Sequence, residues 1–305
     1  MVQERVAGAL SRLSAANLGV FRGCDAVRLG VTRDRLTAQI RAGVIERVLP
    51  DTYRMTATQA SDEQRLRGAL LWAGETATAA GRSAGAAYGL QGVRAELPEI
   101  AVPRASRRLR SPLVIVHRIG NPAALMARRH RGIRVTGVEA TLLQLASSLD
   151  GEELEVACED ARRRGLTSVS ALRAYVDRFG SKGVSGVTAL RTLMSELDPA
   201  RPSRSTLEVV TRRLLVAHGL ADFDREFPLD WQGRTYWFDF AFPASRTILE
   251  TNGRRWHDDP ADYEGDNEKW SVPGRYGYKL VLATWDKVTR HGTQLIEELD
   301  ITLAA

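Results

Sequence analysis

Apolar residues recur at helical spacing over the first 45 positions of the chain and then alternate with polar ones. This pattern predicts three helices, within residues 4–19, 22–31 and 32–43, each followed by or ending in a glycine. Residues 44–55 alternate around Pro50-Asp51 and predict a two-stranded hairpin. Helix, turn, helix and hairpin in this order predict a winged helix-turn-helix over residues 1–57.

The third of these helices is the predicted recognition helix, with Thr32 as its N-cap. Its apolar positions recur four residues apart and are expected to face the core: Leu36, Ile40 and Val44. Three basic residues are then left outward or at its N-terminal end, where side chains reach base edges or phosphates: Arg33, Arg35 and Arg41. An ordinary solvated helix face would look the same.

Residues 62–197 predict a middle α+β domain. Residues 99–106 and 112–119 are rich in β-branched residues and read as strands, and periodicity typical of helices returns over 139–195. The loop between the strands holds the densest positive charge of the chain: Arg104, Arg107, Arg108 and Arg110. A second basic run follows at residues 128–131. Both are candidates for phosphate contact or are simply solvated. The polar, proline-containing residues 198–205 predict a linker.

The pattern of residues 203–305 predicts a small mixed sheet flanked by helices. The expected order is a helix over 206–219, strands over 225–231, 234–243 and 246–252, a helix over 262–272, a strand over 278–285 and one closing helix over 286–300. The whole chain is therefore predicted to be a multidomain α+β protein.

Two carboxylates interrupt the apolar strands of this last domain. Asp239 is flanked by aromatic residues, and Glu250 follows Ile248 and Leu249. A buried isolated carboxylate is costly unless it is paired, hydrogen-bonded or bound to a metal. Together with Glu208, from the first turn of the preceding helix, these acids are expected to converge around Mg²⁺ or Mn²⁺. The alternative is pairing with nearby arginines at positions 234, 246 and 254.

Composition and charge favour a nucleic-acid partner. The chain has 305 residues, of which 44% are hydrophobic and 26% charged, and no apolar run is long enough to span a membrane. We therefore expect a cytoplasmic protein with no membrane association. Cys24 and Cys158 lack the spacing of a metal site or a disulfide framework. Residues 1–150 carry a net charge of +10 and residues 151–305 one of −4, so a polyanion is expected to dock on the first half.

The segment "GVFRGCDAVRLGVTRDRLTAQIRAGVIERVLPDTYRM" resembles the N-terminal winged helix of AbiEi-type antitoxins from type IV toxin–antitoxin systems. The resemblance continues through "AAGRSAGAAYGLQGV" and "EIAVPRASRRLRSPLVIVHRI" and covers about residues 15–195. It implies DNA binding by a non-catalytic transcriptional regulator, or an antitoxin that acts on a toxin partner.

The segment "DFAFPASRTILETNGRRWH", residues 239–257, resembles the metal-binding region of the very-short-patch-repair (Vsr) endonucleases and of Vsr-related domains. Within the PD-(D/E)XK nuclease superfamily this resemblance covers about residues 205–290. It implies a metal-dependent DNA endonuclease in which Asp239 is the principal metal ligand, Glu208 its partner from the helix, and Glu250 the acid of the next strand.

The same resemblance assigns further residues after the second strand. His257 matches the histidine of the family's Trp-His pair and is a candidate acid or base. Trp256, after Arg254 and Arg255, matches an aromatic residue implicated in DNA contact, and an indole is suited to stacking on bases. Asn252 departs from the family, which has His, Asp or Lys there. Asparagine can orient a water molecule but cannot act as a general base, so the domain is either a nuclease that uses His257 or a binding-only relative.

Overall fold

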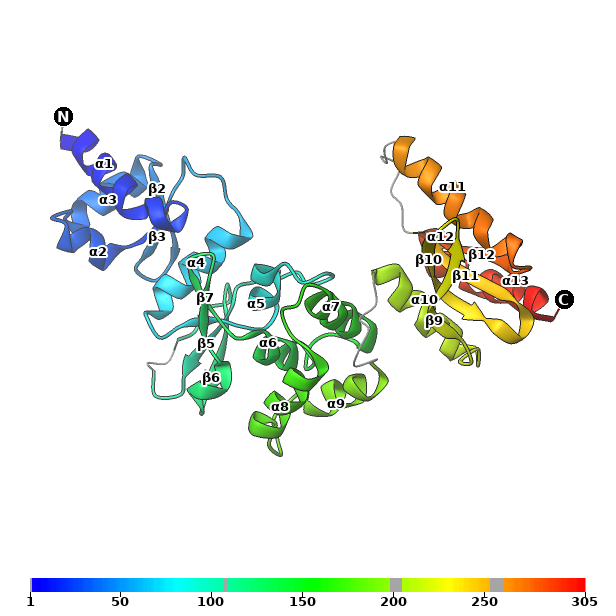
Figure 1. Ribbon diagram of the computed structural model, residues 1–305. Coiled ribbons are helices and arrows are strands. Elements are labelled where there is room, and N and C mark those ends of the chain that lie inside the picture. The colour runs from blue at the N-terminus through cyan, green and yellow to red at the C-terminus, as the bar shows by residue number, and fades with distance from the viewer. Residues whose placement is uncertain (1, 107–108, 198–204, 253–259, 305) are drawn as a thin grey trace. The chain divides into compact units, whose positions relative to one another are not determined.

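A computed structural model describes residues 2–106, 109–197, 205–252 and 260–304, with only the backbone for 2–5 and 260–267. The chain forms two compact units, Met1–Pro202 and Ser203–Ala305, each of which contains helices and at least one sheet (Figure 1). The protein is therefore a multidomain α+β protein, as the sequence predicts. The unit boundary falls in the predicted linker, and the predicted N-terminal and middle domains both lie in the first unit. None of the described helices is long and apolar enough to cross a membrane.

The first unit begins with the elements of the predicted winged helix. They are α1 (Val2–Ser14), η1 (Ala15–Asn17), β1 (Val20–Arg22), α2 (Gly23–Arg28), α3 (Arg33–Arg41), β2 (Ile45–Leu49) and β3 (Thr52–Met55). The strands form an antiparallel sheet in the order β1-β3-β2. The Thr32 hydroxyl accepts a hydrogen bond from Arg35 N at 3.3 Å and caps α3, as predicted. Leu10, Phe21, Leu36 and Ile45 form the centre of this core.

The buried face of α3 differs from the predicted one. Leu36 is buried, but the next buried residue is Gln39, while Ile40 is 38% exposed. The helix ends at Arg41, so Val44 lies beyond it and packs from the loop, with its N–H on Gln39 O. A nine-residue helix presents positions three apart, here Leu36 and Gln39, to the core.

The rest of the first unit is a five-stranded mixed sheet, covered by helices. The strand order is β6-β5-β4-β8-β7, in which β4-β8 and β5-β6 are parallel. The strands are β4 (Thr78–Ala79), β5 (Glu99–Pro103), β6 (Ile115–Ile119), β7 (Arg128–His130) and β8 (Ile133–Val135). The helices are α4 (Asp62–Ala73), α5 (Gly81–Tyr88), η2 (Pro122–Leu125), α6 (Val138–Leu145), α7 (Gly151–Arg163), α8 (Val169–Phe179) and α9 (Val187–Glu196).

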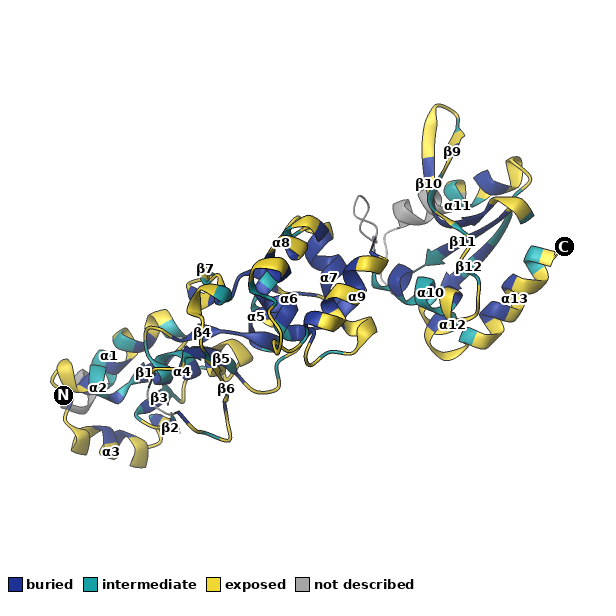
Figure 2. Ribbon diagram, turned by 90° about the horizontal axis from the view of Figure 1, so that it is seen from below, coloured by how far each residue is buried: buried dark blue, intermediate teal, exposed yellow. Residues whose placement is uncertain are grey.

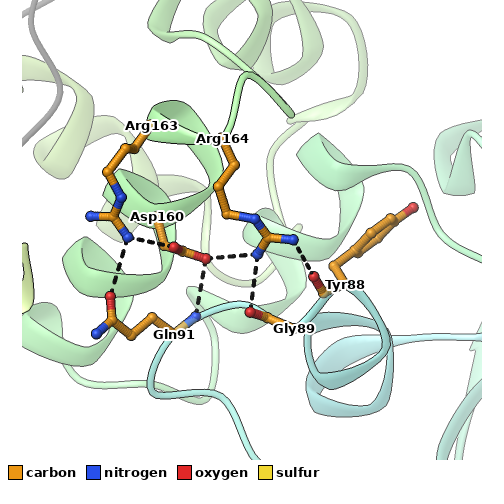
Figure 3. A network of polar contacts seen from close by, with 6 residues as sticks. All are labelled: Tyr88, Gly89, Gln91, Asp160, Arg163 and Arg164. Atoms are coloured by element: carbon orange, nitrogen blue, oxygen red, sulfur yellow. Dashed lines mark hydrogen bonds and ion pairs between the residues drawn. The ribbon is translucent and has the colours of Figure 1, made fainter. Parts of the chain in front are cut away.

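Charged residues at the C-terminal end of α7 join this helix to the segment that follows α5. Asp160 accepts hydrogen bonds from Gln91 N at 3.3 Å and from Arg164 at 2.9 Å, and also pairs with Arg163 (Figure 3). Arg164 in turn donates to the carbonyl oxygens of Tyr88 and Gly89, at 2.8 and 3.0 Å. The network therefore ties the end of α7 to the turn that follows α5, and it satisfies carbonyls left open at a helix end.

The second unit is the predicted mixed sheet flanked by helices. Its elements are α10 (Thr206–Ala217), β9 (Asp224–Trp231), β10 (Arg234–Phe242), η3 (Pro243–Ser245), β11 (Thr247–Asn252), α11 (Pro260–Arg275), β12 (Lys279–Thr284), α12 (Trp285–Arg290) and α13 (Gly292–Ala304). The order is β12-β11-β10-β9, with β11 and β12 parallel. The single closing helix predicted over 286–300 is wrong: the chain breaks at His291. A side chain at Gly292 would approach Leu214 of α10 to 3.1 Å, so a glycine permits the close packing there.

The two faces of this sheet carry different helices. Val272 of α11 packs with Phe238 and Ile248 on one face. Residues of α10, α12 and α13 pack with Phe240 and Leu249 on the other, and the central strands β10 and β11 are largely buried (Figure 2). Phe238 and Phe240 are two residues apart yet contribute to opposite faces, so the alternation of β10 reverses at the residue between them. That residue is Asp239.

Candidate active site

Asp239 and Glu250 lie side by side on β10 and β11. Asp239 directly precedes Phe240 and Glu250 directly follows Leu249, the residue paired with Phe240, and both acids are buried. Asp239 N donates a hydrogen bond to Glu250 Oε2 at 3.1 Å, a bond that a regular ladder would give to a backbone carbonyl. The predicted convergence of these two acids on adjacent strands is therefore present in the structure.

Thr251 fixes the carboxylate of Asp239. Asp239 Oδ2 accepts hydrogen bonds from Thr251 N at 2.8 Å and from the Thr251 hydroxyl. From the described part of the chain, no donor reaches Asp239 Oδ1. One oxygen of this carboxylate is thus oriented by the protein, and the other is available to a ligand.

Lys269 of α11 completes the cluster. It was not among the site residues predicted from the sequence. Its ammonium group donates to Glu250 Oε1 and lies 5.1 Å from the centre of the Phe238 ring. The sequence did hold a signal. Lysine occurs only four times in the chain, and Lys269 is three residues before the buried Val272, hence on the face of α11 that packs on the sheet.

The charges of this cluster do not balance. Burial, and then the neighbouring Asp239 carboxylate, raise the pKa of Glu250 to about 7, although Lys269 opposes this effect. Two carboxylates with one ammonium carry a net negative charge when all three are ionised. A buried site of this kind is stabilised by a further cation.

The raised pKa predicts a particular dependence of stability on pH. Between pH 4.5 and about 7 the unfolded chain has lost the Glu250 proton while the folded chain keeps it. The free energy of unfolding therefore falls as pH rises through this window, by about 3 kcal/mol in total. We expect Glu250→Gln to remove this part of the dependence. The free energy of unfolding of the variant should therefore rise relative to that of the wild type between pH 4.5 and pH 8.

Urea denaturation in the presence of EDTA, followed by tryptophan fluorescence, measures this effect. Five of the six tryptophans lie in residues 203–305, so the signal reports mainly on the second unit. Glu298→Gln, which removes an exposed acid paired with Lys287, is the control. Parallel pH curves for the wild type and Glu250→Gln would contradict the prediction.

The site fits a small divalent cation in part. Mg²⁺ is held in proteins by one or two carboxylates, with water or substrate phosphates in its other positions. Asp239 Oδ1 and Glu250 match that requirement. Glu208, predicted as a third ligand, instead pairs with Arg225 of β9 at 2.9 Å. Within the described ranges no group of three or more His, Cys, Asp or Glu side chains could hold a metal ion.

The other predicted site residues are more dispersed. Asn252 is half-buried at the end of β11, two residues beyond Glu250 and paired with Thr284 of β12. Four residues of the following segment lie outside the described residues: Arg254, Arg255, Trp256 and His257. The same holds for Arg107 and Arg108, whereas Arg104 and Arg110 of that loop are exposed. Arg33, Arg35 and Arg41 are exposed on α3.

Within the described residues neither central acid pairs with an arginine, and Arg254, the third arginine of the predicted alternative, lies outside those residues. Arg234 lies over the ring of Tyr236, and Arg246 lies near Gly277. Of the three predicted metal ligands, Glu208 alone pairs with an arginine of the described chain, and that residue, Arg225, was not among those expected. Lysine, from a helix remote in sequence, is the partner of Glu250.

Comparison with known proteins gives little beyond this geometry. No family model matches the chain, and no curated protein matches it. Among solved structures, the chain is similar to the crystal structure of the RV2827C protein from Mycobacterium tuberculosis. The identity is 20%, with 67% of this chain and 80% of that chain covered and a TM-score of 0.46.

Proposed function

We propose that this protein binds DNA and that its second unit hydrolyses phosphodiester bonds with the help of Mg²⁺ or Mn²⁺. The observation that carries the proposal is the cluster formed by Asp239 and Glu250, buried within β10 and β11, and Lys269 of α11. Two acids that share a site with a lysine combine cation binding with a positive charge for a phosphate. The resemblance to Vsr-type nucleases supports the same reading.

The roles of the two acids follow from their contacts. Asp239 Oδ1 and the Glu250 carboxylate would hold the cation, while Thr251 keeps Asp239 oriented through Oδ2. When bound, the cation supplies polarisation of the phosphodiester and a lower pKa for the attacking water. Because both acids sit on paired strands, their separation is set by the sheet and not by a loop.

Lys269 supplies what Asn252 lacks. Asparagine carries no charge, and it stands where related enzymes have a charged or ionisable residue. The Lys269 ammonium group contacts Glu250 from α11. The Lys269 side chain is 22% exposed, so a phosphate at the site can contact it. We assign it to stabilising the negative charge that develops on the phosphate during hydrolysis.

DNA binding is assigned to the first unit, with α3 as the helix that enters the groove. Thr32 caps α3, which places Arg33 and Arg35 in its first turn. The Arg33 side chain is 74% exposed and lies 3.9 Å from the Asp51 carboxylate in the β2–β3 turn. An arginine this exposed is free to leave a weak pair for a base edge or a phosphate.

Cleavage of supercoiled plasmid by the purified full-length chain tests the proposed hydrolysis. We expect nicked or linear DNA with Mg²⁺ or Mn²⁺ and none with EDTA. Single-stranded and duplex oligonucleotides extend the assay to other substrates. Absence of metal-dependent cleavage on all of them, with DNA binding intact, would overturn the nuclease assignment and leave a non-catalytic regulator.

The double substitution Arg33→Ala with Arg35→Ala tests the assigned recognition helix. We expect it to weaken binding to duplex DNA roughly tenfold or more, because both base-edge and phosphate contacts are lost. Gel shifts or fluorescence anisotropy measure the affinity. Arg94→Ala with Arg191→Ala removes the same charge from two other exposed positions and is the control. Equal loss in both double variants would point to net charge alone and count against α3.

A further inference from the structure

Two arginines face each other across the β7–β8 hairpin. Arg129 and Arg134 are directly opposite in the antiparallel register, and both are exposed. Side chains in such a pair have Cβ atoms about 5 Å apart, and like charges there are destabilising. No acidic side chain of the described chain forms an ion pair with either of them.

Arg134 is held in place without losing its charge. Its Nε donates to the hydroxyl of Thr78 on β4 at 3.1 Å, and Thr78 is completely buried. The acceptor is neutral, so the guanidinium keeps its positive charge while one edge is anchored. Its remaining N–H groups are left to other acceptors.

The turn of the same hairpin holds a third arginine in an unfavourable conformation. Arg131 has φ +47° and the next residue, Gly132, has φ +78°. Two residues of positive φ in a two-residue hairpin loop normally include Asn, Asp or Gly at the first position, because other side chains crowd the backbone. The Arg131 carbonyl oxygen accepts a hydrogen bond from Arg67 at 3.0 Å, which supports the turn.

Protection of a sheet edge does not account for all three. β7 is an edge strand, and charged residues there prevent pairing with another chain. β8, however, lies between β4 and β7, so Arg134 is inside the sheet. The repulsion within the opposed pair and the strain at Arg131 both cost the hairpin stability. Local choices that cost stability are expected at functional sites.

We propose that Arg129, Arg131 and Arg134 form a phosphate-binding site on the β7–β8 hairpin, and that its ligand is the phosphodiester backbone of DNA. Guanidinium groups match phosphate oxygens in geometry and charge, and an anion between Arg129 and Arg134 removes their repulsion. The identity of the ligand rests on the proposed DNA binding. The site adds a contact surface remote in sequence from α3.

Two variants test the site by measurements with opposite expected signs. In 20 mM NaCl without DNA, we expect Arg129→Gln, which keeps the Arg134–Thr78 hydrogen bond, to melt at a higher temperature than the wild type, because the repulsion is gone. Affinity of the double variant Arg129→Gln with Arg134→Gln for a 30-base-pair duplex should fall roughly tenfold at 0.1 M salt. The slope of log affinity against log salt should become shallower by about 2, since each lost phosphate contact contributes about 0.9.

Arg94→Gln with Arg191→Gln carries the same charge change and should alter neither the melting temperature nor the salt slope by comparable amounts. A wild type that binds duplex while the hairpin variant keeps both the same affinity and the same salt slope would overturn this site and leave the proposed function standing. A lower melting temperature of Arg129→Gln would show that the opposed arginines do not repel each other and would also overturn the site. A wild type that binds no duplex at any salt would overturn the proposed function together with the site.

Discussion

Asp239→Ala is expected to abolish metal-dependent DNA cleavage, with a loss of roughly a thousandfold or more in rate. Asp239 offers the one carboxylate oxygen of the cluster that no described donor occupies, and Thr251 fixes its direction. Its removal leaves Glu250 as the one acid that pairs with Lys269 in the described part of the chain. A single carboxylate already paired with a lysine holds a divalent cation poorly, so the loss should appear with Mg²⁺ and Mn²⁺ alike.

The measurement is plasmid nicking over a range of metal concentrations, beside duplex binding by the same preparation. Asp222→Ala removes an exposed acid of the same unit and should cleave like the wild type. Asp239→Asn keeps the side-chain shape and should also be inactive, which separates the charge from packing. Cleavage by Asp239→Ala at the wild-type rate would mean that a contaminating nuclease, or a different site, is responsible.

The fold was largely predictable where the sequence carries a local signal, such as alternation of apolar and polar residues or a helix cap. The two-residue alternation around residues 44–55 gave the β2–β3 hairpin, and the cap at Thr32 gave the start of α3. Prediction failed where a helix is short or interrupted. Ile40 fits a helical period of four, yet α3 stops at Arg41 and Gln39 takes the buried position. At Gly292, directly after the break at His291, Leu214 of α10 approaches closely, a contact between distant residues that no local pattern contains.

Of the residues in the candidate site, only those that break a local sequence rule could be predicted. Asp239 and Glu250 stand out because an acid within an apolar strand is costly. Thr251 and Lys269 violate nothing, since threonine is common in strands and lysine common on helices. Their importance comes from register and from the packing of α11. Glu208 obeyed the family pattern in sequence, but the proximity of Arg225 on β9 gives it a partner of its own.

In the proposed mechanism the positive charge at the site comes from Lys269, and Asn252 carries none. We expect Lys269→Met to lower the cleavage rate roughly a hundredfold at neutral pH, because the positive charge that stabilises the phosphate is lost. Methionine keeps the length and apolar character of the stem beside Phe238, so the packing of α11 should survive. Lys269 lowers the pKa of Glu250, which burial and Asp239 raise to about 7. Its removal should therefore raise that pKa further.

This second effect separates a chemical role from a structural one. With a higher pKa, Glu250 stays protonated to a higher pH, and the acid limb of the cleavage profile should shift upward in Lys269→Met. Raising the pH should then recover part of the lost rate, whereas a misfolded variant would recover none. Lys269→Arg should keep the profile close to that of the wild type, and Lys287→Met, which removes a surface ion pair with Glu298, should leave it unchanged. An unshifted acid limb in Lys269→Met would show that the Lys269–Glu250 pair does not set the ionisation of the site.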